Sequence, residues 1–63
     1  MILHDYSMAI TKSDIYRYLN SQFRIEWSGF DYTIRDLKNQ CTVAVDFVTF
    51  IDALVFLEET HLI

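Results

Sequence analysis

The side chains that could support chemistry in this sequence are one cysteine, two histidines and nine carboxylates. Cys41, His61 and a nearby aspartate would be the parts of a nucleophile, its base and an orienting group. Their positions in the sequence do not place them together, and 63 residues leave no second domain to close a cleft over them. His4 and His61 lack the spacing of a metal-ligand pair. We therefore expect a protein that is not an enzyme and that binds neither a cofactor nor a metal ion.

Nucleotide and nucleic-acid binding also lack the residues that they need. The sequence has one glycine and no proline, so it cannot form the glycine-rich loop that cradles phosphates. Aromatic side chains stack on bases in proteins that also provide a cationic groove, and this sequence predicts no such groove. Trp27 and Tyr32 are expected in the core. Tyr16 leaves the buried side of its predicted helix by about 100° and is expected to be an exposed anchor for a partner.

The net charge of −4 is concentrated in one part of the chain. Residues 1–40 contain five acids and five bases, which balance, whereas residues 41–63 contain no Lys or Arg. The acids of this last third are Asp46, Asp52, Glu58 and Glu59. A surface of this sign repels nucleic-acid phosphates and attracts a basic protein surface. The expected partner is therefore another protein with a basic surface, with no direct contact to nucleic acid.

Length and composition predict one small α+β domain over residues 1–63. The hydrophobic content of 52% gives this short chain enough apolar side chains for a core. The longest uninterrupted apolar stretches are far shorter than a membrane span, and the N-terminus has no basic leader. A single cysteine, Cys41, fits a reducing compartment. We therefore expect a cytoplasmic protein that makes no contact with a membrane.

Hydrophobic spacing and turn signals predict the order helix, three strands, helix. A hydroxyl residue three positions before an acid, at Thr11 and again at Thr49, is the signal of a helix start. The predicted elements are a helix over residues 12–21, strands on either side of turns at residues 28–29 and 37–40, and a helix over residues 50–61. Leu19 is expected on the buried face of the first helix, and residues 2–10 could add an N-terminal edge strand. The fold class is α+β, a three-stranded antiparallel meander with two helices on one face.

The turns predict which residues face each other across the strands. A two-residue turn at Ser28-Gly29 is favoured because Gly29 supplies the positive φ that such hairpins require. The pairs that result are Trp27 with Phe30, Ile25 with Tyr32, and Phe23 with Ile34. A four-residue loop over residues 37–40 then gives the pairs Ile34 with Val43, Tyr32 with Val45, and Phe30 with Phe47. Every pair is apolar, which predicts one strongly hydrophobic face of the sheet.

The same register predicts a row of carboxylates on the other face of the sheet. Glu26 would lie opposite Asp31, and Asp31 opposite Asp46. Directly opposed like charges destabilise a sheet, so the row could receive cationic side chains, as a surface imitating DNA phosphates would. Strand twist and screening by solvent could equally make the row of no consequence. The residues expected to bind the partner are Glu26, Asp31, Asp46, Asp52, Glu58, Glu59 and Tyr16.

The second predicted helix has more apolar residues than its core-facing side uses. Ile51, Val55 and Leu62 form a lateral stripe on it. A second copy of the chain could cover this stripe, because paired identical patches are the commonest way in which subunits associate. A homodimer with a structural or regulatory role is therefore an alternative function.

The strands followed by residues 47–58, FVTFIDALVFLE, resemble the meander-plus-helix arm-binding domains of tyrosine recombinases. The resemblance covers about half of the chain. It implies this topology and, as a third hypothesis, an accessory domain that contacts DNA. The predicted sheet departs from that pattern, because its polar face carries Glu26, Asp31 and Asp46 beside only Arg24 and Arg35.

The first hypothesis for function follows from charge and from the lack of catalytic groups. It is a small acidic inhibitor or adaptor that occupies a basic surface of a nucleic-acid-handling protein. A phage or mobile element would use such a protein against a host nuclease, such as a CRISPR effector, or against a polymerase. Salt dependence separates it from the homodimer, since a charge-driven complex weakens with salt and an apolar one does not.

Overall fold

The computed structural model describes residues 10–63. The edge strand expected over residues 2–10 lies outside the described residues, apart from Ile10. The element order is α-β-β-β-α, as predicted. The elements are α2 (Lys12–Leu19), β1 (Phe23–Trp27), β2 (Tyr32–Asp36), β3 (Cys41–Phe47) and α3 (Phe50–Glu59). No helix within residues 10–63 has the length and apolar character needed to cross a membrane.

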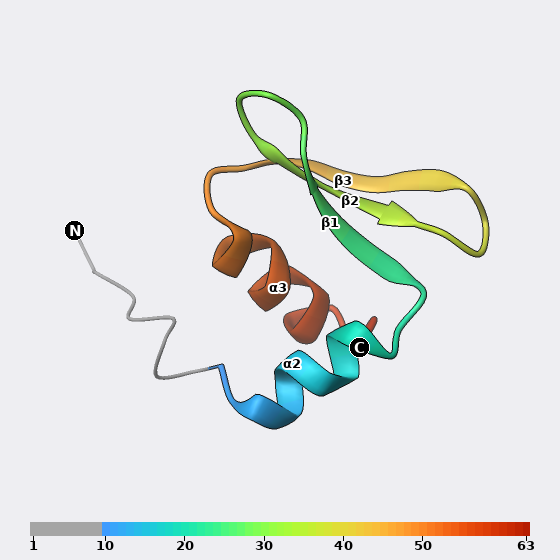
Figure 1. Cartoon of the computed structure of the whole chain (residues 1–63), viewed down its shortest axis with the longest axis vertical. Helices are drawn as coiled ribbons and strands as arrows, with labels where there is room; N and C mark the ends of the chain where they lie inside the picture. The colour runs from blue at the N-terminus through green and yellow to red at the C-terminus, as the bar shows by residue number, and fades with distance from the viewer. Residues whose placement is uncertain (1–9) are drawn as a thin grey trace.

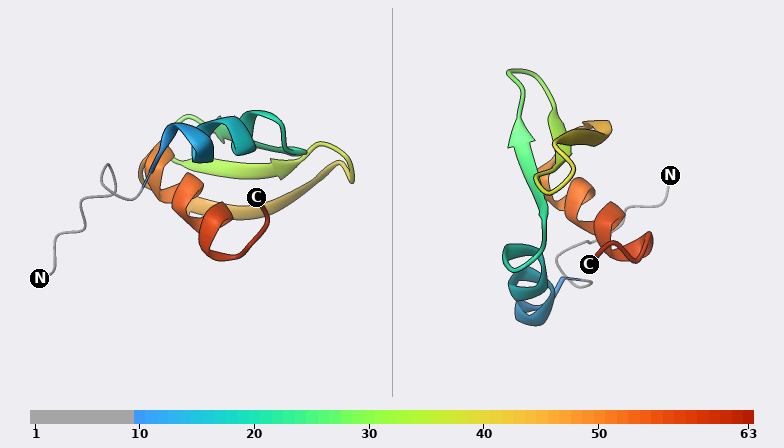
Figure 2. Two further views of the ribbon diagram at one scale, coloured as in Figure 1. Left: turned by 90° about the horizontal axis from the view of Figure 1, so that it is seen from below. Right: turned by 90° about the vertical axis from the view of Figure 1, so that its right-hand side faces the viewer.

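The three strands form one antiparallel sheet in the order β1-β2-β3. In Figure 1 the helix α3 runs beneath the sheet, and α2 lies below the start of β1. Figure 2 shows two further views, in which α3 lies alongside the sheet. Both helices reach the same core, as predicted, and α3 supplies half of its members. The buried hydrophobic residues are Tyr18, Phe23, Ile34, Ala53, Leu54 and Leu57.

Both helices begin with the predicted capping box. The Thr11 hydroxyl accepts from the Asp14 amide at 3.2 Å, and the Asp14 carboxylate accepts from the Thr11 amide at 2.9 Å. Thr49 and Asp52 repeat the arrangement at 3.1 and 3.2 Å. These bonds satisfy amide groups that a helix start would otherwise leave unpaired. They explain why a short polar pattern predicts both helix starts.

The helix α2 ends at Leu19, two residues before the predicted end. At this end the Arg24 guanidinium donates to the carbonyl groups of Leu19 and Ser21 at 3.2 and 2.9 Å. A cation at this position also interacts favourably with the negative end of the helix dipole. The prediction that Leu19 is buried is wrong, because this last residue of the shortened helix is exposed.

The predicted two-residue turn between β1 and β2 is wrong. The strands are joined by the four residues Ser28–Asp31, so Trp27 faces Tyr32, Ile25 faces Ile34 and Phe23 faces Asp36. The Ser28 amide donates to the Asp31 carbonyl at 2.8 Å, and the Asp31 amide donates to the Ser28 hydroxyl at 3.3 Å. These reciprocal bonds close the wider loop, in which Gly29 has a φ of 118°. The need for glycine was therefore predicted correctly and the loop length was not.

The loop over residues 37–40 is confirmed, since Asp36 pairs with Cys41, but the register beyond it is wrong. Two irregularities shift β3 so that Ile34 pairs with Ala44 and Tyr32 pairs with Phe47. Asp46 lies at the irregularity between these two pairs, where it takes a left-handed φ of 71°. Bulges of this kind insert an extra residue and locally reset the inward and outward alternation. Ala44 and Phe47 therefore pack on the core, and the predicted inward residues Val43 and Val45 are exposed.

Both edges of this small sheet are protected against pairing with another strand. On β1, the outward amide of Ile25 donates to the Tyr18 hydroxyl at 2.9 Å, and that of Phe23 donates to the Ser21 hydroxyl at 3.2 Å. On β3, the two irregularities interrupt the regular row of backbone groups. Blocked and bulged edges are common protections against strand addition. A partner is therefore expected to contact side chains rather than extend the sheet.

Candidate protein-binding surface

The predicted row of carboxylates is absent because the register differs. Glu26 lies opposite Thr33 rather than Asp31. Asp31 belongs to the loop before β2, where its carboxylate accepts from the Ser28 hydroxyl. Asp46 occupies the left-handed position near the end of β3. No two of the three acids face each other across the strands, so the predicted like-charge repulsion within the sheet does not arise.

Most of the other predicted acids have local partners. Glu26 lies 3.9 Å from the Arg35 guanidinium, and Glu58 lies 4.0 Å from that of Arg17. Asp52 takes part in the capping box of α3. Within residues 10–63, the structure gives Asp46 and Glu59 no hydrogen bond or ion pair from their side chains. Glu26, Glu58 and Asp52 therefore have contacts within the fold, whereas the side chains of Asp46 and Glu59 are free to contact a partner.

The predicted self-association stripe lies on the side of α3 that approaches α2. Glu58, which shares this side with Ile51 and Val55 by helical spacing, meets Arg17 of α2. Ile51 and Val55 are half-buried, and Leu62 is exposed. Part of the stripe is thus covered within the chain. Self-association through it stays a prediction.

Three exposed large hydrophobic residues, including the two most exposed, belong to the end of the sheet where β1 ends and β2 begins. Phe30 is 83% exposed, Val48 is 81% exposed and Trp27 is 57% exposed. Tyr32 and Phe47, which pair across β2 and β3, place the loop of Phe30 and the segment of Val48 at this same end. We call Trp27, Phe30 and Val48 the aromatic end. The prediction that Trp27 lies in the core is wrong, because β1 extends beyond the helices there.

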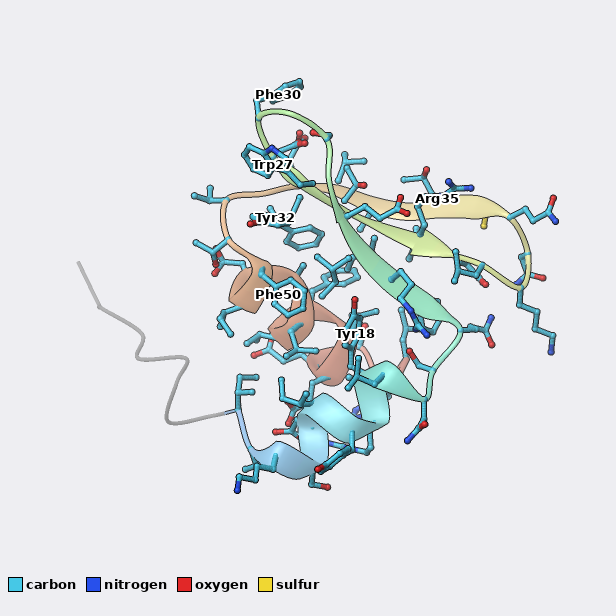
Figure 3. All side chains as sticks on the ribbon, in the orientation of Figure 1. Tyr18, Trp27, Phe30, Tyr32, Arg35 and Phe50 are labelled. Carbon is cyan, nitrogen blue, oxygen red and sulfur yellow. The ribbon has the colours of Figure 1, made fainter. Side chains whose placement is uncertain are left out.

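A row of aromatic contacts supports the aromatic end from below (Figure 3). The rings of Trp27 and Tyr32 have centroids 4.9 Å apart, and Tyr32 lies 6.3 Å from Phe50. Phe50 in turn meets the buried ring of Tyr18 edge-on at 5.6 Å. Contacts at these distances are favourable for aromatic rings. The row connects exposed Trp27 with the core, so its ring is held in place although more than half of it faces solvent.

The loop that carries Phe30 is closed by several hydrogen bonds. Besides the two backbone donations between Ser28 and Asp31, the Ser28 hydroxyl lies 3.0 Å from the Asp31 carbonyl and donates to its carboxylate. Gly29 permits the positive φ that the loop requires. Phe30 is the side chain that projects from this closed loop, as Figure 3 shows. The hydrogen bonds between Ser28 and Asp31 thus hold the backbone on either side of Phe30.

The charged residues in the two segments that form the aromatic end are all acidic. Residues 26–33 and 45–52, which form this end, contain four acids and no Lys or Arg. The acids are Glu26, Asp31, Asp46 and Asp52. The basic residues Arg24, Arg35 and Lys38 belong to the other half of the sheet and the loop that follows it, as the label of Arg35 in Figure 3 illustrates. An apolar centre with an acidic margin is therefore the main chemical feature of this surface.

One sequence signal could have located this surface. Ser28-x-x-Asp31 repeats the hydroxyl-x-x-acid pattern of the two helix starts, Thr11-x-x-Asp14 and Thr49-x-x-Asp52. The pattern at Ser28 does not precede a helix, and its reciprocal bonds instead close a loop with two residues inside. Treated as two residues that bond to each other across two intervening positions, Ser28 and Asp31 indicate a four-residue loop with Phe30 outside the sheet.

The remaining predicted anchor and the candidates for chemistry lie elsewhere. Tyr16 is 64% exposed, as predicted, and with Lys12, Ile15 and Leu19 it lines a shallow hollow on the outer side of α2. Cys41 begins β3 and is exposed, and His61 follows α3 with a φ of 59°. Within residues 10–63, no three His, Cys, Asp or Glu side chains come together in a way that could hold a metal ion.

Comparisons with protein-family models, with curated proteins and with solved structures found no match. The resemblance to tyrosine recombinase arm-binding domains therefore stays one of topology.

Proposed function

We propose that this chain is a non-catalytic protein-binding module that docks through its aromatic end. The single observation that carries the proposal is Phe30, which is 83% exposed on a hydrogen-bonded loop beside acids and no base. Its partner is a protein with an apolar pocket bordered by Lys or Arg side chains. A small inhibitor or adaptor that occupies a basic surface of a nucleic-acid-handling protein fits this description, and so does an anti-CRISPR protein of a phage or mobile element.

The composition of the aromatic end supports protein binding. Large exposed apolar patches on small proteins commonly mark interaction sites. Aromatic side chains, Trp and Tyr above all, are enriched among the residues that contribute most to binding, and they act best when surrounded by a polar margin. Trp27, Phe30 and Val48 supply the apolar centre, while Asp31 and Asp46 supply such a margin.

The charge of the aromatic end decides which class of partner we propose. Nucleic acid is disfavoured because binding to phosphates depends on Lys and Arg, and residues 26–33 and 45–52 have neither. Two copies meeting through their aromatic ends would bring like charges together. A basic partner instead gains complementary charge, which raises the association rate and suppresses wrong partners. We place this binding in the cytoplasm, of the host cell if the protein is viral.

The hydrogen-bonded loop reduces what binding costs. Ordering a flexible loop or a rotamer-rich side chain opposes association by about 0.5–1.5 kcal/mol for each side chain. Ser28 and Asp31 already fix the backbone on either side of Phe30. Little backbone ordering therefore remains to be done on binding. This favours a preformed pocket on the partner, into which Phe30 inserts.

Position-specific photo-cross-linking tests this proposal in cells that naturally contain the protein. A photoreactive phenylalanine analogue replaces Phe30 in one variant and Leu37 in the other. Leu37 is a matched control, because it is an exposed apolar residue in the loop at the opposite end of the sheet. We expect one specific protein, other than a second copy of the chain, to be cross-linked from position 30 and not from position 37. Equal cross-linking from both positions, or none from position 30, would contradict the proposal.

A further inference from the structure

The hollow on α2 has the chemistry that the aromatic end requires of its partner. Its lining is mostly apolar, from Ile15, Tyr16 and Leu19, and Lys12 stands at its margin. Its volume is about 370 Å³ and it is open to solvent, a size near the lower end of the range of small-ligand sites. Within residues 10–63, the structure gives Lys12 no ion pair. The chain thus carries both an aromatic projection with an acid beside it and an apolar hollow with a base beside it.

The two surfaces lie too far apart to meet within one molecule. The loop Ser28–Asp31 is at the top of Figure 1 and α2 is at the bottom. The right-hand view of Figure 2 confirms this separation. A second copy can therefore present its loop to the hollow of the first without displacing any element.

We propose that the hollow on α2 binds Phe30 of a second copy, with Lys12 of the first copy facing Asp31 of the second. This inference rests on the proposed docking role of Phe30. The contact joins two different surfaces, so it is head-to-tail, and it builds a ring or an open chain rather than a symmetric dimer. Tyr16 gives the incoming Phe30 ring an aromatic face to contact.

A consequence of this contact is competition between assembly and partner binding. A loop seated in the hollow of another copy is not available to the basic partner. Free modules would then be released from the assembly as the partner binds them, because binding to the free form shifts the equilibrium by mass action. The exposed hollow would therefore compete with the basic partner for the aromatic end, and would keep that end covered until the partner binds.

Complementation between two disabled variants tests the head-to-tail contact. Phe30→Ala removes the projection and leaves the hollow intact. Tyr16→Glu disables the hollow, because the new carboxylate enters it and pairs with Lys12 one helical turn away. In sedimentation equilibrium, we expect the wild type to assemble increasingly as its concentration rises. Each variant alone should self-associate with an affinity at least about tenfold lower. An equimolar mixture should form a complex of two chains that grows no further.

Control variants keep the test independent of folding. Ser13→Glu introduces the same charge on an exposed position of α2 outside the hollow, and Leu37→Ala removes an exposed apolar side chain at the other end. Both should assemble as the wild type does. A wild type that stays monomeric, a variant that assembles as well as the wild type, or a mixture without the two-chain complex would overturn the inference.

The outcome is distinguishable from that of the proposed function. Tyr16→Glu leaves the aromatic end intact, so it should still be cross-linked to the partner from position 30. A monomeric wild type that is cross-linked from position 30 would remove the head-to-tail contact and keep the proposed function. Assembly in which position 30 is cross-linked only to a second copy of the chain would keep the head-to-tail contact and remove the proposed function.

Discussion

Asp31, Asp36 and Asp46 are three aspartates of one sheet region with three different environments. Asp31 closes a loop, and Asp46 holds a left-handed backbone position. Asp36 is buried and accepts hydrogen bonds from the side chains of Gln22 and Asn39 and from two backbone amides. Only Asp46 has a side chain without such a partner within residues 10–63. Counting acids in the sequence could not separate these roles, because each is fixed by local hydrogen bonds.

The buried carboxylate of Asp36 should make stability depend on pH. Burial acts to raise its pKa, but the hydrogen bonds from Asn39, Gln22 and the Lys38 amide outweigh burial and hold the pKa below the ordinary 3.8. A lowered pKa means that the ionised form stabilises the fold above pH 4, and that this contribution is lost as the pH falls through the lowered value.

The variant Asp36→Asn removes that titration. We expect it to be less stable than the wild type at pH 7, with the difference shrinking as the pH falls below about 4. Urea unfolding followed by circular dichroism, from pH 7 to below about pH 4, measures the stability of the variant and of the wild type at each pH. A difference that stays constant with pH would show that the ionised carboxylate is not what Asp36 contributes.

Asp46 allows a second prediction at the residue scale, because its φ is 71°. Glycine adopts this conformation without steric cost, whereas a β-branched side chain does not. Asp46→Val should therefore be less stable than Asp46→Gly by about 1–2 kcal/mol, measured by urea unfolding. If Asp46 instead had regular strand geometry, Asp46→Val would be the more stable of the two variants, since valine forms strands better than glycine does.

At the scale of elements, the sequence predicts most of the fold and misses the register. Helix starts at Thr11 and Thr49 and the bounds of β1 follow from local patterns, and the structure confirms them. The register fails where the sequence offers two loop lengths and where β3 is irregular. Bulges conserve the alternating pattern of the sequence while changing which residues face inward. These register errors placed Phe30 on the predicted hydrophobic face of the sheet and created the predicted row of acids.

The loop between β1 and β2 gives the element-scale prediction. Ser28→Ala removes the hydroxyl that bonds to the amide, carbonyl and carboxylate groups of Asp31. We expect a loss of stability of about 0.5–1.5 kcal/mol and a lower backbone order parameter at Gly29 and Phe30 in ¹⁵N relaxation. Ser13→Ala, on the exposed side of α2, should change neither. An unchanged order parameter in Ser28→Ala would mean that other contacts hold the loop.

At the scale of the whole molecule, charge and hydrophobic surface are separated along the sheet. The aromatic end carries acids only, while Arg24, Arg35 and Lys38 belong to the opposite half. Arg24 is occupied by the carbonyl groups that end α2, and Arg35 lies within 3.9 Å of Glu26. Arg24 and Arg35 are thus engaged within the fold, whereas the aromatic end has exposed apolar side chains and two acids at its margin, Asp31 in the loop and Asp46 near the end of β3. This asymmetry is why we assign binding to the aromatic end.

The most direct test of this account is the affinity for the partner identified by cross-linking from position 30, measured by isothermal titration calorimetry. We expect Phe30→Ala to weaken binding by about 2 kcal/mol or more, as truncation of a central aromatic anchor does, and Leu37→Ala to leave it unchanged. Binding by the wild type should also weaken as salt rises. An affinity that Phe30→Ala does not change, or that falls equally in Leu37→Ala, would contradict the claim that the chain binds through its aromatic end.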